Sequence, residues 1–315
     1  MVKNSCKKIL VTGGAGFIGS NLCESLLFNG HYVISLDNYC SGSIKNLKNI
    51  KDHKNFKIIN ADVSKKRVIR NIDEIYNLAC PGSPVHYQKE PHKTIETSIL
   101  GTFRLIELAR LNNSKILFSS TSEVYGDPLS HPQIETYWGN VNPIGIRSCY
   151  DESKRCAETI LMDEWRANKT EIKICRIFNT YGPKMLPNDG RVISNFIYQA
   201  LNNKPITIYG NGSQTRSFCY IDDMINGIIA MMNSNKNVTG PINLGNTNEY
   251  TIYEIAKKII KYTNSNSKIL YKKLPLDDPR RRKPNINKAK KILKWKPSIR
   301  LNEGLKKTIQ YFKKI

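Results

Sequence analysis

The stretch that decides the fold reads Lys8-Ile9-Leu10-Val11-Thr12-Gly13-Gly14-Ala15-Gly16-Phe17-Ile18-Gly19-Ser20. Its first five residues form a short apolar run rich in β-branched side chains, which is typical of a buried strand. The glycines at positions 13, 16 and 19 have the spacing GxxGxxG, and a helical pattern of leucines follows them. Glycines at such a turn let the backbone approach a pyrophosphate, whose charge lies at the helix N-terminus. The stretch therefore predicts a dinucleotide-binding turn.

Outward from this turn, strand-like runs alternate with helical patterns. Further strands are expected at residues 32–36, 56–59, 74–79, 115–119 and 172–178, with helices between several of them. Such alternation indicates a parallel sheet that carries helices on both faces. Beyond Pro183 the rhythm becomes irregular. We therefore predict an α/β protein, with a Rossmann-type doubly wound parallel sheet and a smaller C-terminal α/β substrate-binding domain.

Acidic residues close the second and third strands. Asp37 ends the second strand, where an acid accepts hydrogen bonds from ribose hydroxyls and repels a 2′-phosphate. This position favours NAD over NADP. Asp62, with Val63, follows the third strand and is expected to meet the adenine. On spacing alone, Asp62 could instead cap the local backbone.

A second group of polar residues follows the fifth strand. Thr121, Ser122 and Glu123 stand at the strand end, while Tyr150 and Lys154 are four positions apart and so share one face of a helix. A free Tyr has a pKa of about 10 and is a poor base at neutral pH. We expect the Lys154 ammonium and a positively charged nicotinamide to lower that pKa. The pattern predicts oxidation of a sugar-like alcohol.

The formal net charge of the 315-residue chain is +23. Such an excess can indicate a protein that binds nucleic acid or an anionic substrate. The lysines are dispersed, however, and Asn and Ile are also over-used, as an AT-rich coding sequence would produce. We interpret the charge as compositional drift that also attracts anionic ligands.

The eight cysteines are scattered, with no CxxC spacing and no accompanying histidine cluster. This pattern favours reduced thiols over a zinc site or a disulfide framework. No apolar run approaches the roughly 20 residues of a membrane helix, and the N-terminus lacks the apolar core of a signal peptide. We expect a cytoplasmic protein without a metal or a membrane segment.

Longer motifs add a family resemblance. They are Thr121–Asp127, Tyr137–Gly145, Arg147–Glu152, Arg176–Pro183, Asn188–Val192, Gln214–Phe218 and Arg282–Pro284. With the glycine turn and the Tyr-Lys pair, these motifs resemble the UDP-glucuronate decarboxylases (UDP-xylose synthases). That group lies within the extended short-chain dehydrogenase/reductase family, also called the NAD-dependent epimerase/dehydratase family. The resemblance runs from about Lys8 to the C-terminus.

The resemblance implies a carboxy-lyase reaction. Tyr150 would deprotonate the 4-hydroxyl of UDP-glucuronate while C4 gives hydride to NAD⁺, and the resulting 4-keto acid would lose CO₂. Hydride return would give UDP-xylose, so the cofactor is recycled and stays tightly bound. The expected ligands are NAD and UDP-glucuronate or UDP-xylose.

The resemblance also implies an organisation of the chain. Residues 1–181 would form the NAD-binding Rossmann domain, residues 217–248 would return to it, and residues 182–216 and 249–315 would form the UDP-sugar-binding domain. The family expectation is a homodimer paired through the helices around 95–106 and 157–165. Their apolar faces could equally pack within one subunit.

The motifs and the resemblance together give three sets of expected site residues. The catalytic set is Tyr150, Lys154, Thr121, Ser122, Glu123 and Arg282. The cofactor-binding set is Gly13, Gly16, Phe17, Ile18, Gly19, Asp37, Asn38, Ser41, Gly42, Asp62, Val63, Leu78, Ala79, Thr97, Ser119, Tyr150, Lys154 and Thr180. The substrate-binding set is Arg147, Asn179, Arg191, Tyr209, Arg216 and Arg282.

Alternative readings remain open at this point. The strand-end hydroxyls could cap backbone, Glu123 could be a structural carboxylate, and the arginines could be solvated. Another nucleotide-sugar epimerase or a 4,6-dehydratase is the nearest alternative, although a dehydratase would carry Asp-Glu in place of Ser122-Glu123 and an epimerase would lack the carboxylate at position 123. Early loss of NADH would release a 4-keto-pentose. From a different class, a basic RNA-binding protein on this scaffold is disfavoured because no aromatic-interleaved basic patch is visible.

Two positions and one segment depart from the family pattern. Cys80 stands where Ser is usual, Glu96 where Lys is common, and residues 64–70 are unusually basic. These departures affect individual contacts and leave the reaction class unchanged.

Overall fold

The structure is a computed structural model, and it describes residues 6–187, 189–274 and 281–315. A seven-stranded sheet forms its centre, with the order β11-β6-β5-β4-β1-β2-β3. Its strands are β1 (Lys8–Thr12), β2 (Tyr32–Asp37), β3 (Phe56–Asn60), β4 (Glu74–Asn77), β5 (Lys115–Thr121), β6 (Ile172–Ile177) and β11 (Ile242–Leu244). Every neighbouring pair is parallel. The predicted α/β fold class is confirmed.

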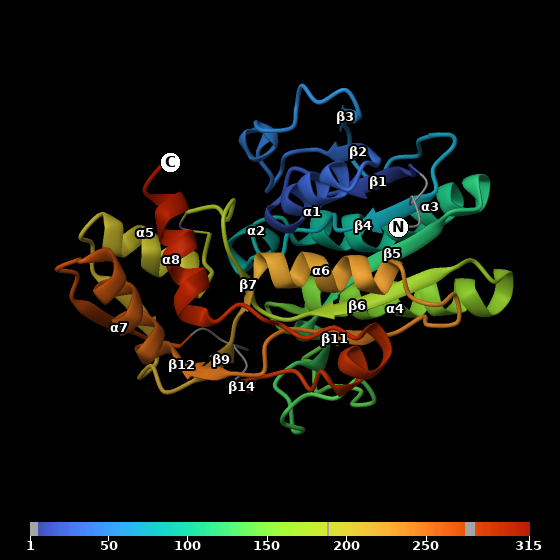
Figure 1. Cartoon of the computed structure of the whole chain (residues 1–315). Helices are drawn as coiled ribbons and strands as arrows, with labels where there is room; N and C mark the ends of the chain where they lie inside the picture. The colour runs from blue at the N-terminus through green and yellow to red at the C-terminus, as the bar shows by residue number, and fades with distance from the viewer. Residues whose placement is uncertain (1–5, 188, 275–280) are drawn as a thin grey trace.

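Helices cover both faces of this sheet (Figure 1). On one face, α1 (Phe17–Phe28) packs beside α6 (Ile221–Met232), and on the other α3 (Pro91–Asn112) packs against α4 (Ser148–Asn168). The alternation of side chains along β1 explains the two layers, because Ile9 and Val11 join one hydrophobic cluster and Leu10 joins the other.

The strand order reverses beside β1. From β1 the chain moves outward to β2 and β3, then crosses back to β4 on the opposite side of β1. Such a reversal leaves a crevice beyond the carboxyl ends of the strands, where ligands of doubly wound sheets bind. The glycine turn after β1 and the polar ends of β5 and β6 all lie at this edge.

A second group of elements lies beside the carboxyl edge of the sheet (Figure 1). Helices α5 (Val192–Leu201), α7 (Ile252–Thr263) and α8 (Leu301–Phe312) pack together there. Strand β8 (Ile206–Tyr209) pairs with β13 (Ile269–Lys272), and β9 (Thr215–Ser217) lies between β12 (Glu249–Thr251) and β14 (Arg281–Arg282). The register of β9 and β14 sets Arg282 opposite Arg216, so two distant segments deliver arginines to one place.

The remaining elements are short. They are η1 (Ile44–Leu47), α2 (Pro84–Tyr87), η2 (Ser122–Tyr125), β7 (Thr180–Tyr181), β10 (Cys219–Tyr220) and η3 (Ala289–Leu293). The strand expected at 74–79 ends at Asn77, which frees the next residues to form the loop before α2. Residues 275–280, just before the Arg282–Pro284 motif, and Asn188 of the Asn188–Val192 motif lie outside the described residues.

Candidate active site

The glycine turn after β1 has no room for side chains. A Cβ at Gly19 would lie 2.0 Å from the carbonyl oxygen of Gly13, and one at Gly13 would lie 2.8 Å from the backbone of Leu78. Gly13 also has a φ of +70°, which L side chains rarely adopt. The turn thus exposes bare backbone at the N-terminus of α1, and this fits the pyrophosphate of a dinucleotide.

Asp37 is held in place beside this turn. Its Oδ2 accepts the N–H of Ala15 at 2.9 Å, and its Oδ1 accepts the N–H of Tyr39 at 2.8 Å. Burial raises the pKa of Asp37, while these backbone N–H groups oppose the rise. A carboxylate offers about four acceptor sites, so Asp37 retains capacity for ribose hydroxyls. The residues therefore fit NAD.

Tyr150 and Lys154 share the inner face of the first turns of α4. Both side chains are buried. The Nζ of Lys154 donates a hydrogen bond to the carbonyl oxygen of Ser119 at 2.9 Å and lies 5.9 Å from the centroid of the Tyr150 ring. The ammonium is thus fixed by the end of β5, close to the phenol.

The protein groups alone do not lower the pKa of Tyr150. Burial raises that pKa, and the hydrogen bond from Thr121 opposes the rise only in part. Burial also lowers the pKa of Lys154. Lys154 and a nicotinamide were expected to lower the Tyr150 pKa together, so that expectation stays a prediction. A nicotinamide cation beside the phenol would add positive charge that favours the phenolate.

Glu123 lies among arginines at the end of β5. Its Oε2 accepts hydrogen bonds from Nη2 of Arg147 and from Nη2 of Arg282, the latter at 2.9 Å. Burial alone would raise the pKa of Glu123, but the charges of Arg282, Arg147 and Arg216 hold it below its ordinary value. Glu123 is therefore ionised at neutral pH. Arg282 itself is buried, whereas its neighbour Arg281 is exposed.

The hydroxyls before Glu123 partly serve the backbone. The Oγ1 of Thr121 accepts the N–H of Glu123 at 3.2 Å and caps η2, and the Oγ of Ser122 lies 3.5 Å from Oε1 of Glu123. Thr121 therefore does cap the backbone, which was the alternative role for the strand-end hydroxyls. Its hydroxyl also interacts with Tyr150, so one group links the turn to the phenol.

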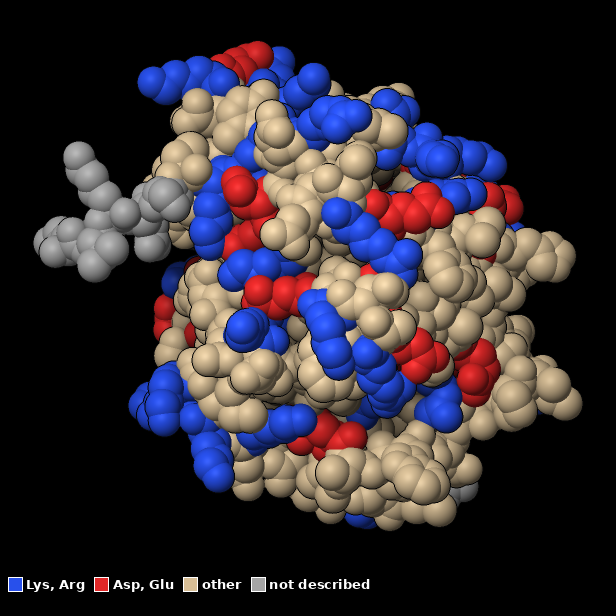
Figure 2. Space-filling view, turned by 90° about the vertical axis from the view of Figure 1, so that its right-hand side faces the viewer, with Lys and Arg blue, Asp and Glu red and all other residues tan. Residues whose placement is uncertain are grey.

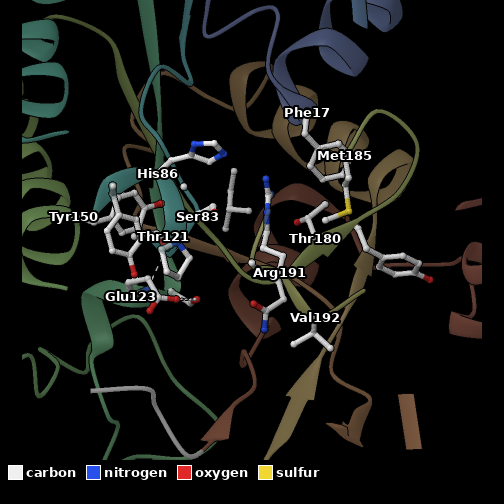
Figure 3. A pocket seen from close by; sticks show the side chains of 18 of the residues that line it. Phe17, Ser83, His86, Thr121, Glu123, Tyr150, Thr180, Met185, Arg191 and Val192 are labelled. Atoms are coloured by element: carbon white, nitrogen blue, oxygen red, sulfur yellow. Dashed lines mark hydrogen bonds between the residues drawn. The ribbon is translucent and has the colours of Figure 1, made fainter. Parts of the chain in front are cut away.

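The glycine turn, Tyr150, Lys154 and the Thr121–Glu123 strand end line one cavity of about 540 Å³. In Figure 3, Tyr150, Thr121 and Glu123 lie at one end, Phe17 and Met185 at the other, and the Arg191 side chain between them. All residues expected to be catalytic or substrate-binding line this cavity. Of the expected cofactor residues, the lining contains Gly13, Gly16, Phe17, Ile18, Gly19, Ser41, Leu78, Ser119, Tyr150, Lys154 and Thr180. Those outside the lining are Asp37, Asn38, Gly42, Asp62, Val63, Ala79 and Thr97.

Asp62 is occupied by protein groups. Its carboxylate lies 2.6 Å from Nζ of Lys93 and accepts the hydroxyl and backbone N–H of Ser64. Burial alone would raise the pKa of Asp62, but the hydrogen bonds from Lys93 and Ser64 lower it to about 2. Asp62 therefore caps the local backbone, as the alternative interpretation expected. Its contact with the adenine stays a prediction.

Two of the departures from the family pattern lie in the same ion-pair group. Glu96 contacts Nζ of Lys93 at 2.7 Å and Nζ of Lys65 at 3.5 Å. Lys65 belongs to the basic segment 64–70. An acid in place of the usual Lys thus meets lysines that can neutralise it. The third departure, Cys80, lines the cavity with its Sγ 3.2 Å from Oγ of Ser98.

Sequence reasoning missed the wall formed by the loop after β4 and by α2. The ring of Tyr87 stacks on that of Tyr150, with centroids 5.1 Å apart and planes 7° apart. Ser83 and His86 also line the cavity. The sequence could have indicated this wall, because Gly82-Ser83-Pro84 follow the carboxyl end of a central strand, where ligands of such sheets bind.

Charges are interspersed on the face shown in Figure 2, where Lys and Arg alternate with Asp, Glu and uncharged residues. That face therefore offers no continuous basic track for a nucleic-acid backbone. Across residues 6–187, 189–274 and 281–315, no group of three or more His, Cys, Asp or Glu could hold a metal ion. Within the same residues, no helix has both the length and the apolarity that a membrane crossing requires.

Comparisons with known proteins agree with this geometry. The family model described as GDP-mannose 4,6 dehydratase matches residues 10–308. The solved UDP-glucuronic acid 4-epimerase of Bacillus cereus, in complex with UDP-glucuronic acid and NAD, has a TM-score of 0.89 and 30% identity, covering 98% of this chain and 99% of that chain. A dTDP-glucose 4,6-dehydratase of Bacillus anthracis in complex with NAD has a TM-score of 0.85 and 27% identity, covering 98% and 97%. The fold and the site thus define a nucleotide-sugar enzyme of the extended short-chain dehydrogenase/reductase family.

Curated relatives narrow the assignment. UDP-glucuronic acid decarboxylase 3 of Arabidopsis thaliana is 52% identical over 299 residues, which cover 95% of this chain and 86% of the relative. UDP-glucuronic acid decarboxylase 1 of Xenopus tropicalis is 49% identical over 308 residues, covering 98% and 72%. Within the family, the chain belongs to the UDP-glucuronic acid decarboxylases, which confirms the resemblance found in the sequence motifs.

Proposed function

We propose that this enzyme converts UDP-glucuronate to UDP-xylose and CO₂ with bound NAD. The observation that carries the proposal is the contact between Glu123 and Arg282 beside Tyr150. An epimerase or a dehydrogenase needs the Tyr-Lys pair. A decarboxylase must also hold a carboxylate and manage the charge that CO₂ loss leaves behind, and the arginines around Glu123 suit that task.

Oxidation at C4 is the first task. Bound NAD would take the C4 hydride and give it back at the end of the cycle. Removal of that hydride turns C4 into a ketone, so the C6 carboxylate becomes that of a β-keto acid. Tyr150 takes the proton of the 4-hydroxyl, and Thr121 holds the phenol and the alcohol oxygen in line. Lys154, anchored on Ser119, contributes positive charge beside the phenolate.

Loss of CO₂ is the second task. Arg282 and Arg147 orient the substrate carboxylate, because guanidinium forks match carboxylates in geometry and charge. Loss of CO₂ leaves an enolate that must gain a proton at C5. Glu123 is held ionised, so it is suited to orient a water that gives this proton rather than to release one itself. Tyr150 then returns its proton to the 4-oxygen as the ketone is reduced.

The nucleotide is held by groups farther along the cavity. The guanidinium of Arg191 is fixed by the buried Asp189 at 2.6 Å and lies 5.7 Å from the Phe17 ring centroid, beside the glycine turn. The Nδ2 of Asn179 is buried without a hydrogen-bond partner in the described structure. An unpartnered donor in a cavity wall is suited to a phosphate or sugar oxygen. Tyr209, exposed at the end of β8, is placed to cover the uracil.

The proposed organisation follows the segments that meet at this cavity. Residues 1–181 with 217–248 would bind NAD, and residues 182–216 with 249–315 would bind the UDP-sugar. The pairing of β11 with β6 supports the return of 217–248 to the large sheet. Limited proteolysis near these bounds tests this division into two domains. After cleavage, each domain should unfold in a separate transition.

We also propose a homodimer that pairs through α3. This helix leaves Ile95, Leu100 and Phe103 exposed, so its predicted apolar face is only partly used within the subunit. By contrast, Ala157 and Leu161 of α4 are fully buried. Phe103→Asp should yield monomers in analytical ultracentrifugation, whereas Leu129→Asp, at an exposed site elsewhere, should not. Monomeric wild-type protein would contradict the proposal.

A cytoplasmic location is proposed on the state of the thiols. The described cysteines, positions 6, 23, 40, 80, 149, 156, 175 and 219, are all free. Free thiols persist in reducing compartments. A tagged protein that fractionates with a secretory compartment would contradict this.

Product analysis tests the reaction. Purified protein is incubated with UDP-glucuronate, and the nucleotide products are separated by chromatography and weighed by mass spectrometry. UDP-xylose is the expected product. An isomer of unchanged mass would indicate an epimerase, and a UDP-4-keto-pentose would indicate early loss of NADH. Turnover of UDP-glucose in place of UDP-glucuronate would indicate a dehydratase.

A further inference from the structure

Asp151 is a second buried carboxylate at the edge of the active site. It lies in the first turn of α4, directly after Tyr150, and is only 6% exposed. Its Oδ1 is buried without a hydrogen-bond partner, and its Oδ2 lies 3.8 Å from Nε of Arg147, beyond hydrogen-bond distance. Of the two neighbouring acids, Arg147 hydrogen-bonds Glu123. One guanidinium therefore lies between Glu123, which it hydrogen-bonds, and Asp151, with which it forms only a longer ion pair.

An ionised carboxylate in that position would be costly. A buried anion needs hydrogen bonds or a close cation, and Asp151 has one oxygen without either. Protonation removes that charge, so burial with so few partners favours the neutral form of Asp151. The position at the N-terminus of α4 favours the anion and works in the opposite direction.

Several titratable or charged groups surround Asp151. Glu123 faces it from η2, Arg147 from the loop before α4, and Arg282 from β14, while Glu152 follows it on its own helix. Tyr87 of α2 and the neighbours Cys149 and Tyr150 also respond to its charge. Burial and the charge of Glu123 raise the pKa of Asp151 to about 8, against the opposing effect of Arg147 and Arg282.

We propose that Asp151 is a positioning residue: while protonated it leaves Arg147 on Glu123 and available to the carboxylate of the substrate, and once ionised it draws Arg147 away. This proposal rests on the function proposed above. Asp151 does not line the cavity, so it acts through Arg147. Its ionisation also adds a negative charge near the place where the C6 carboxylate binds. Both effects weaken binding of UDP-glucuronate more than binding of a UDP-sugar without a carboxylate.

The proposal predicts that KM for UDP-glucuronate increases at alkaline pH, which gives the pH profile an alkaline limb. When only the protonated form binds well, kcat/KM falls about tenfold for each pH unit above the controlling pKa. The limb should begin near pH 8 and should appear in KM more than in kcat. A side chain with a purely structural role would not divide the effect in this way.

The experiment compares three forms of the holoenzyme between pH 6.5 and 9.5. Asp151→Asn keeps the shape of the neutral acid without its titration, and Glu152→Gln is the matched control on the next residue. We expect the KM for UDP-glucuronate to rise about fivefold from pH 8 to pH 9 in wild type and in Glu152→Gln, and to stay level in Asp151→Asn. An alkaline limb that persists in Asp151→Asn, or that is absent from wild type, overturns the proposal.

A binding measurement separates this inference from the proposed reaction. Tyr150→Phe removes a buried acid directly next to Asp151 and prevents turnover. Calorimetry then gives the affinities for UDP-glucuronate and UDP-glucose at pH 7 and pH 9. A loss of affinity confined to UDP-glucuronate supports the role of Asp151. Failure of the protein to release CO₂ would contradict only the proposed reaction. Equal loss for both ligands, or loss for neither, overturns the inference even if Asp151→Asn fails to fold.

Discussion

Arg282 donates a hydrogen bond from Nη2 to Oε2 of Glu123 at 2.9 Å, across 159 residues of sequence. The two side chains come from different parts of the fold, Glu123 from the end of β5 and Arg282 from β14. Because β14 pairs with β9 in a register that sets Arg282 opposite Arg216, the C-terminal part of the chain completes a site that begins on the central sheet.

Removal of Arg282 should impair decarboxylation strongly. Arg282→Gln leaves the buried carboxylate of Glu123 with one fewer cation, and loss of one partner of a buried charge pair costs about 3–5 kcal/mol. We expect kcat/KM for CO₂ release to fall by roughly a hundredfold or more, as 1.4 kcal/mol corresponds to about a factor of ten. Arg281→Gln, at the exposed neighbouring position, should behave like wild type. Equal effects of the two substitutions would contradict a role for Arg282 in the site.

Tyr150→Phe should stop turnover and keep ligand binding. The substitution removes the hydroxyl that exchanges a proton with the 4-oxygen, and loss of such a general acid-base group costs about 10²–10⁴-fold in rate. The Phe ring keeps the stack on Tyr87, so the fold should be unchanged. Tyr253→Phe on the exposed side of α7 is the control. Residual activity of Tyr150→Phe close to that of Tyr253→Phe would remove Tyr150 from the mechanism.

Asp37 should determine the choice of dinucleotide. Asp37→Ser removes the acceptor for ribose hydroxyls and the repulsion of a 2′-phosphate, so NAD affinity should fall and NADP affinity should rise. Cofactor released from denatured protein and titration of cofactor-free protein measure both changes. Asp52→Asn, at an exposed site, serves as the control. Unchanged discrimination in Asp37→Ser would place the ribose elsewhere.

Asp151 should also affect stability in a pH-dependent way. Its pKa is about 8 in the folded protein and about 3.9 in an unfolded chain. Between these values the folded state binds more protons than the unfolded state, so this group makes the free energy of unfolding decrease as pH rises from about 4 to about 8, with no further change above. Asp151→Asn lacks this decrease, so its stability relative to wild type should increase from pH 5.5 to pH 8.

Urea unfolding at several pH values measures that difference. Asp163→Asn, at an exposed position of the same helix, should track wild type across the range. A stability difference between Asp151→Asn and wild type that does not vary with pH would show that Asp151 is ionised in the folded protein at all of these pH values.

Local sequence patterns were sufficient for much of the fold and part of the site. The glycine spacing and the alternation of apolar runs predicted the parallel sheet, because both depend on the backbone needs of neighbouring residues. The four-residue spacing of Tyr150 and Lys154 placed both on one helix face. Arg282 was reached only through the family resemblance, since its place beside Glu123 depends on β14 pairing with β9.

Contacts between distant segments could not be predicted from such local patterns. The stack of Tyr87 on Tyr150 and the pairing of Lys93 with Asp62 join residues from separate elements, and nothing in their spacing predicts them. The pKa of Tyr150 shows the same limit. Lys154 and a nicotinamide were expected to lower that pKa, whereas burial, which only the folded structure reveals, raises it in the protein alone.

The most direct test of the central claim uses UDP-glucuronate labelled with ¹³C at the C6 carboxyl and follows the label together with the nucleotide products. We predict one labelled CO₂ for each UDP-xylose formed, with no net change in the bound NAD. Label that stays in a UDP-hexuronate while the substrate is consumed would contradict the assignment of this site to decarboxylation.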